Sequence, residues 1–142
     1  MNNAFALHPQ LAADTTLLTD GPLSHVLLMN DARYPWLILV PKRPDLVDYD
    51  DLSTEDRITL GNEVAAVSKV IKRRFEAYKT NVAMLGNMVP QLHCHVVGRF
   101  KNDPAWPGPI WGVGTAQPYA EDAGRDRLAT LRADLISAFK HL

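Results

Sequence analysis

The order of apolar segments along the chain limits its fold more than any other feature of the sequence. Two short apolar runs, 25–29 and 36–40, flank a polar stretch rich in turn-forming residues, and this pattern predicts an antiparallel hairpin. A second pair of strands is predicted at 81–85 and 89–100, joined by a turn at Gly86-Asn87. Because strands joined by short turns run antiparallel, we expect one antiparallel sheet.

Three helices are predicted around these strands. The longest covers 53–78, where a capping pattern precedes a single apolar stripe. A short helix is expected to begin at Pro9, and a C-terminal helix to run from 122 to 141. The segment 101–118 is rich in proline and tryptophan and is predicted to be an ordered loop. The sequence therefore predicts a single α+β domain over residues 1–142, with helices on one face of the sheet.

Composition excludes several classes of function. The 142 residues include 15 basic and 16 acidic side chains, a balance that argues against binding a nucleic acid polymer. No apolar run approaches the ~20 residues needed to cross a membrane, and the first residues do not resemble a signal peptide. The one cysteine cannot form an internal disulfide. We expect a cytoplasmic protein without membrane contact that acts on a small molecule or on a protein partner.

The candidate chemistry lies in the last predicted strand, in the run Gln91-Leu92-His93-Cys94-His95-Val96-Val97. Side chains alternate between the two faces of a strand, so Gln91, His93 and His95 share one face and Cys94 points to the other. A core strand has no packing reason to hold three polar groups in one row, because each would need a hydrogen-bond partner. This row is therefore the candidate functional site.

Three interpretations of the two histidines are open from the residues alone. They can belong to an exposed polar face, or form a His-x-His metal site. Zinc would need further ligands, and Cys94 points away while no carboxylate follows before Asp103. The third interpretation is catalysis at phosphorus, in which one neutral imidazole is the nucleophile and the other supplies a proton or a hydrogen bond.

The run from Gln91 to Val97 resembles the histidine triad (HIT) motif, His-φ-His-φ-His-φ-φ with φ apolar, except that Gln91 stands at the first histidine. The rest of the chain is similar to the same superfamily: a strand ending at Val40-Pro41, a basic residue, a long helix and a strand that leads into the motif. The segment 87–112 resembles a bacterial subgroup of that superfamily with glutamine in the first place.

This resemblance implies an antiparallel sheet of about five strands flanked by helices, commonly paired as a homodimer. It implies a nucleotide substrate that is cleaved or transferred at the α-phosphorus through a covalent nucleotidyl-histidine. His93 would be the nucleophile, and His95 would contact the phosphate oxygens. Gln91 would take part in the polar relay around the nucleophile and leaving group, without carrying a proton charge. The scheme requires no metal and no cofactor.

Four further residues are weaker candidates for substrate binding. The resemblance places a ribose-binding residue at Asn30 or Asp31 and a phosphate contact at Asn87, and Arg99 continues the histidine face toward a phosphate. Turn or surface roles are the alternative for each. The competing function is a nucleotide-binding or partner-binding module with little turnover, which the glutamine at position 91 makes plausible.

Overall fold

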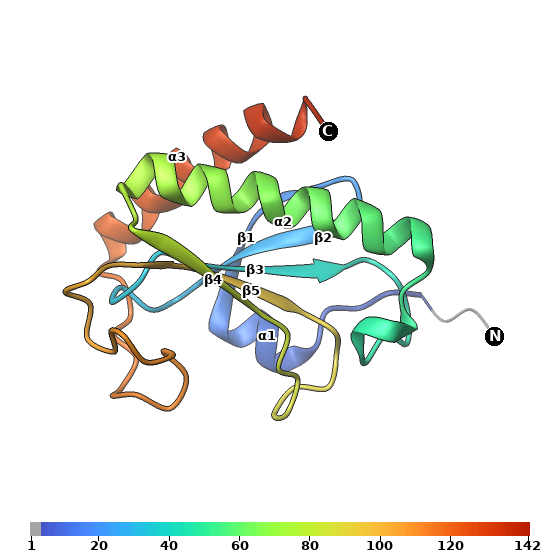
Figure 1. The fold of residues 1–142 in the computed structure, drawn as a ribbon, viewed down its shortest axis with the longest axis horizontal. Coiled ribbons are helices and arrows are strands. Elements are labelled where there is room, and N and C mark those ends of the chain that lie inside the picture. The colour runs from blue at the N-terminus through green and yellow to red at the C-terminus, as the bar shows by residue number, and fades with distance from the viewer. Residues whose placement is uncertain (1–3) are drawn as a thin grey trace.

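The computed structural model describes residues 4–142 and is built around one five-stranded antiparallel sheet (Figure 1). Every pair of neighbouring strands runs antiparallel, which confirms the predicted α+β fold. In spatial order the strands are β1 (Thr15–Asp20), β2 (Ser24–Met29), β3 (Trp36–Pro41), β5 (Cys94–Arg99) and β4 (Lys79–Ala83).

The helices cover both faces of the sheet. α2 (Thr54–Phe75) and α3 (Glu121–Phe139) lie side by side on one face, and the short α1 (Pro9–Asp14) lies on the other (Figure 1). The expectation that all helices share one face is therefore wrong for α1. A short 3-10 turn, Tyr49–Asp51, precedes α2. Within residues 4–142, no helix is long and apolar enough to cross a membrane.

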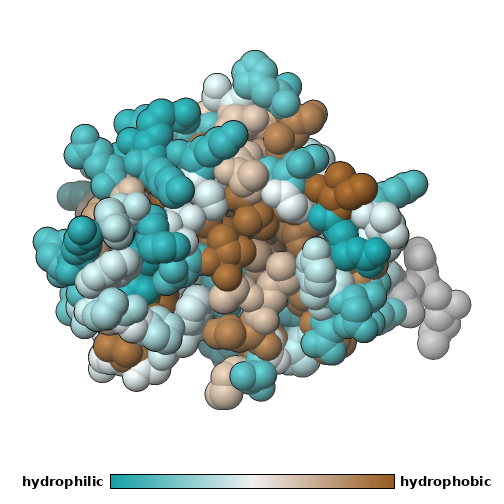
Figure 2. All heavy atoms as spheres, in the orientation of Figure 1, coloured by the Kyte–Doolittle hydropathy of each residue, from teal (hydrophilic) through white to brown (hydrophobic). Residues whose placement is uncertain are grey.

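Alternation along the central strands produces two apolar layers. Leu37 and Leu39 of β3 pack with the helices α2 and α3, whereas Trp36 and Ile38 pack in a second layer with Leu11 of α1. We call the face of the sheet that carries this second layer the site face. The view in Figure 2 shows apolar side chains gathered in a hollow at the centre of the molecule, ringed by hydrophilic ones.

Several elements differ from the sequence prediction. α2 ends at Phe75, three residues early, because Glu76 adopts the left-handed conformation with φ of 54°. β1 lies in a stretch for which no strand was predicted, and its exposed side chains are interrupted by one buried residue, Leu18. β5 begins at Cys94, so residues 84–93 form a loop that carries Gln91 and His93.

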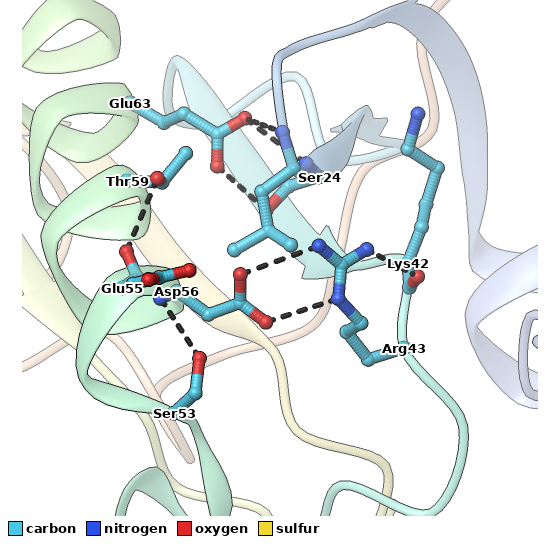
Figure 3. Close-up of polar contacts among 9 residues, drawn as sticks. Ser24, Lys42, Arg43, Ser53, Glu55, Asp56, Thr59 and Glu63 are labelled. Atoms are coloured by element: carbon cyan, nitrogen blue, oxygen red, sulfur yellow. Dashed lines mark hydrogen bonds and ion pairs between the residues drawn. The ribbon is translucent and has the colours of Figure 1, made fainter.

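A buried carboxylate attaches α2 to the turn between β1 and β2. Glu63 is fully buried and accepts hydrogen bonds from the backbone N–H groups of Leu23 and Ser24, both at 3.0 Å, and from the Ser24 hydroxyl at 2.8 Å (Figure 3). Gly21 lies against the same carboxylate, where a Cβ would overlap Glu63 Oε2. All three donors are satisfied by one side chain, so the position of the turn depends on it.

We expect Glu63→Ala to lower the free energy of unfolding by about 2–4 kcal/mol, because it leaves buried donors without an acceptor. The matched control is Arg43→Ala, which removes the exposed ion pair with Asp56 near the start of the same helix and should cost below ~1 kcal/mol (Figure 3). Urea unfolding of both variants measures the difference. Equal losses would show that Glu63 contributes no more than a surface contact.

Candidate active site

His93 and His95 lie side by side on the site face of the sheet. His95 is in β5, paired with Ile38 of β3 and Ala83 of β4, and His93 directly precedes the strand. Their ring centroids are 4.8 Å apart, and each residue is only 6% exposed. Because both rings are buried and in contact, the hydrogen bonds that each ring makes decide what it can do.

The backbone fixes the tautomer of His93. Its Nδ1 lies 2.7 Å from the carbonyl oxygen of Gln91, and a carbonyl can only accept a hydrogen bond. Nδ1 therefore carries the proton, which leaves a free lone pair on Nε2. A neutral imidazole held in this way presents Nε2 as a nucleophile.

An indole fixes the opposite tautomer in His95. The Trp36 Nε1–H group donates to His95 Nδ1 at 3.0 Å, and because an indole can only donate, Nδ1 must hold the lone pair. In the neutral ring the proton is then on Nε2. Burial, together with the neighbouring His93, lowers the pKa of His95 to about 3, so the ring stays neutral near pH 7. His95 is a hydrogen-bond donor beside a nucleophile.

A cavity of about 510 Å³ opens in front of the two rings. Its wall contains both histidines and a largely apolar surface made by Leu11, Met29, Trp36, Ile38, Val89 and Trp111. The Trp111 ring stands edge-on to His95, with centroids 5.3 Å apart. The cavity has the size and character of a site for one small organic molecule with a polar group at the histidines.

A second hollow of about 280 Å³ adjoins the cavity through His93, Leu85 and Gly86, which contribute to both walls. Its other side contains Asp48 and Asp50 from the 3-10 turn. Among residues 4–142, no group of three or more His, Cys, Asp or Glu side chains is placed to hold a metal ion. The histidine face therefore has room for a substrate on two sides and lacks a ligand set for zinc.

Of the four predicted substrate-binding residues, the structure brings Asn87 to the histidines, where it lines the larger cavity. Asn30 lies elsewhere, and its side-chain oxygen accepts from the Tyr119 backbone N–H at 2.9 Å. Asp31 is fully buried, and both of its carboxylate oxygens accept hydrogen bonds from the Arg33 guanidinium group, three in all. Burial alone would raise the pKa of Asp31, but the hydrogen bonds from Arg33 outweigh it and lower the pKa.

Arg99 is also committed to protein partners, which corrects its expected role toward phosphate. It is 1% exposed, pairs through two nitrogens with Asp103 at 2.8 and 3.0 Å, and donates to Asn81 and the Gly108 carbonyl. Burial opposes ionisation of Asp103, yet Arg99 and backbone N–H groups lower the pKa of this carboxyl to about 2. The pair anchors the proline- and tryptophan-rich loop 101–118.

The side chain of Gln91 is hydrogen-bonded to the backbone of residues 6–8. Its Oε1 accepts from the His8 backbone N–H and its Nε2 donates to the Ala6 carbonyl, each at 2.8 Å. The expected contact of this amide with the nucleophile and leaving group is therefore not what the structure shows. It is the backbone carbonyl of Gln91 that contacts His93.

The cavity-wall residues that the sequence did not predict include Leu11 and Asp14 of α1. The start of α1 at Pro9 was predicted and is confirmed, but nothing in the local pattern placed this helix on the site face. Trp36 packs in the second layer with Trp111 against it, and both line the cavity.

Comparison with known families assigns residues 10–102 to the HIT domain. The chain belongs to the histidine triad (HIT) family.

Three solved HIT structures resemble it along almost its whole length. A histidine triad protein from Marinobacter aquaeolei is 44% identical, covers 95% of this chain and 98% of its own, and has a TM-score of 0.92. One from Bradyrhizobium japonicum is 42% identical, covers 93% and 98%, and has a TM-score of 0.90. One from Sinorhizobium meliloti is 40% identical, covers 92% and 96%, and has a TM-score of 0.89. No curated protein matches the chain.

We expect Trp36→Phe to raise the pKa of His95 and to mix its neutral tautomers, because the donor that opposes protonation of Nδ1 is lost. Trp111→Phe is the matched control: its indole also contacts His95, but its Nε1 has no hydrogen-bond partner. The measurement is a ¹⁵N NMR titration of the imidazoles between pH 3 and 8. If Trp36→Phe and the control leave the same Nε2–H tautomer and the same titration midpoint, Trp36 does not set the state of His95.

The lowered pKa of His95 also predicts how the free energy of unfolding changes with pH. His95 has an ordinary pKa of 6.5 when unfolded and about 3 when folded, so the unfolded chain binds the proton more readily. Stability from this group is therefore complete above pH 6.5 and declines as the pH falls toward 3. Trp36→Phe should make that decline shallower in acid unfolding curves.

Proposed function

We propose that this HIT-family protein is a nucleotide hydrolase or nucleotidyl transferase that acts at an α-phosphorus through a covalent nucleotidyl-His93. The observation that carries the proposal is the opposite tautomer of the two neighbouring histidines. His93 offers a lone pair at Nε2, and His95 offers a proton at Nε2. A nucleophile and a donor at this spacing suit attack on a phosphoryl group, which needs both.

In the first step, His93 Nε2 attacks the α-phosphorus. A P–N bond forms, and the bond from phosphorus to the leaving group breaks, so that the leaving group departs with the electron pair and takes a proton from solvent. The modified imidazole carries a positive charge, which its Nδ1–H shares with the Gln91 carbonyl. The His95 Nε2–H donates to a phosphoryl oxygen as negative charge builds there.

In the second step, water attacks the same phosphorus. A P–O bond forms, the P–N bond breaks, and the electron pair returns to His93 Nε2 while the water gives up a proton to solvent. An acceptor other than water would make the same step a nucleotidyl transfer. Because His95 stays neutral, it can donate to the phosphoryl oxygens in both steps without changing charge.

The cavity supports a nucleotide as the substrate class. Its apolar wall suits a nucleobase, and two groups that the wall contains besides the histidines, Asn87 and Asp14, suit polar atoms of the ligand. The adjoining hollow beside Asp48 and Asp50 gives room for the group that departs. These features support a nucleotide as the substrate class, and experiments with different nucleotides would identify the base and the leaving group.

We expect His93→Ala to abolish turnover of adenosine 5′-phosphoramidate, by about 10³-fold or more, while AMP binding stays within about tenfold. The reason is that a nucleophile acts in the chemical step, whereas most binding contacts lie along the cavity wall. Mass spectrometry after brief incubation should show an acid-labile adenylyl group on His93 of the wild-type protein.

Cys94→Ala is the control for a competing nucleophile next in sequence. Burial raises the pKa of the Cys94 thiol to about 12, so this variant should react like the wild type. Retained hydrolysis by His93→Ala would remove His93 from its role. A wild-type protein that binds AMP but forms no adduct would support the binding-module alternative.

A further inference from the structure

The Gln91 side chain makes two hydrogen bonds to the backbone of one distant stretch. Oε1 accepts from the His8 N–H and Nε2 donates to the Ala6 carbonyl, so one planar amide forms hydrogen bonds with an N–H and a C=O group that are two residues apart. These partners lie 83 and 85 residues away in sequence. Neither a carboxylate nor a neutral imidazole replaces this pairing: the first lacks a donor, and the second holds its donor and acceptor on ring positions that diverge.

The stretch that Gln91 holds is residues 4–14, which we call the N-terminal segment. Phe5 and Leu7 pack partly buried against the second apolar layer, and Leu11 is 5% exposed within it. The helix in this segment, α1, has six residues, too few to be stable without tertiary contacts. Its position on the sheet therefore depends on tertiary contacts. At its C-terminal end the Asn30 backbone N–H donates to the Asp14 carbonyl at 3.0 Å, and at its N-terminal end the apolar contacts and the two hydrogen bonds to Gln91 hold it.

The N-terminal segment forms part of the substrate cavity. Leu11 and Asp14 both line it, together with Met29 of β2 and Trp36 of β3. Asp14 Oδ2 accepts from the Gln10 side chain at 2.9 Å, which aligns its carboxylate along α1. His95 lies on β5 and β3 lies between β5 and β2, whereas α1 contacts β1, so Leu11 and Asp14 line the cavity from the β1–β2 side of the sheet.

We propose that Gln91 is a positioning residue that holds the N-terminal segment in place, so that Leu11 and Asp14 form the wall against the nucleoside part of the substrate. The proposal rests on the function proposed above and gives the amide of Gln91 a role in substrate binding rather than in proton transfer. Loss of the two hydrogen bonds releases the wall while the Gln91 backbone carbonyl continues to orient His93.

The first test is Gln91→Ala. We expect KM for adenosine 5′-phosphoramidate and Kd for AMP to rise about tenfold, with kcat within about twofold, because the amide acts on binding and not on the reacting atoms. Hydrogen exchange of the amides of residues 10–14 should accelerate in the same variant. A change in kcat at unchanged KM and Kd would overturn the proposal.

A pair of variants at His8 tests the same contact from its other end, far from His93. His8 has φ of −55°, which proline accepts, so His8→Pro removes the N–H donor without straining this residue. His8→Ala is the matched control, because both variants lose the side-chain cap that accepts from Gln10 N–H, but only the proline loses the bond to Gln91. We expect KM for His8→Pro to exceed that for His8→Ala about fivefold.

The decisive comparison repeats this pair in the Gln91→Ala background. If the N–H of His8 acts through Gln91, the fivefold ratio should shrink to near one there. The same ratio in both backgrounds would overturn the proposal. A wild-type protein that neither binds AMP nor forms the adduct would instead overturn the proposed function and with it the role of the wall in binding, while hydrogen exchange would still report whether Gln91 holds the segment.

Discussion

The site depends on the hydrogen bonds that fix the neutral tautomers of two buried imidazoles, whose ring centroids are 4.8 Å apart. Burial disfavours a charge on His95, and the neighbouring His93 adds to this effect. Two groups of fixed polarity then determine where each proton lies: the carbonyl of Gln91 accepts from His93, and the indole of Trp36 donates to His95. A lone pair and a donor are thus present before any substrate arrives, which is the preorganisation that phosphoryl chemistry rewards.

Hydrogen bonds to one buried carboxylate also hold the loop 101–118, which contributes Trp111 to the cavity wall. Asp103 accepts from Arg99 and from the backbone N–H groups of Phe100, Ala105 and Trp106, so a buried ion pair is satisfied on every side. Removal of one partner of such a pair is strongly destabilising, because it leaves an uncompensated buried charge. Because the ion pair fixes the chain just after β5, it also carries Ile110 into the second apolar layer and Trp111 onto the cavity wall.

The sequence predicted helix starts well where the chain has an end signal. The helix that begins after Ser53, which also has a long periodic pattern, is one such case, and the start of α1 at Pro9 is another. β1 was missed because its mostly exposed side chains leave no alternation to detect. The roles of polar residues were harder to predict than helices and strands. Asp31 and Arg99 carry groups that could bind a ligand, yet each forms an ion pair with a residue at most four positions away. The local sequence shows that a residue of opposite charge is near, but it does not show that the two side chains form an ion pair.

Gln91 marks the limit of what a motif can reveal. In the sequence, Gln91 falls on the same strand face as His93, which suggests that its side chain contacts the reacting groups. In the structure, the backbone of residues 6–8 lies beside Gln91 and forms hydrogen bonds with its side-chain amide instead. Its backbone carbonyl accepts from His93 Nδ1–H, while its side chain is hydrogen-bonded to the segment that lines the cavity. One residue therefore contacts both His93 and the cavity wall, through two parts that a substitution can separate. A side-chain change removes the second contact and keeps the first, which is why binding and turnover are expected to respond differently.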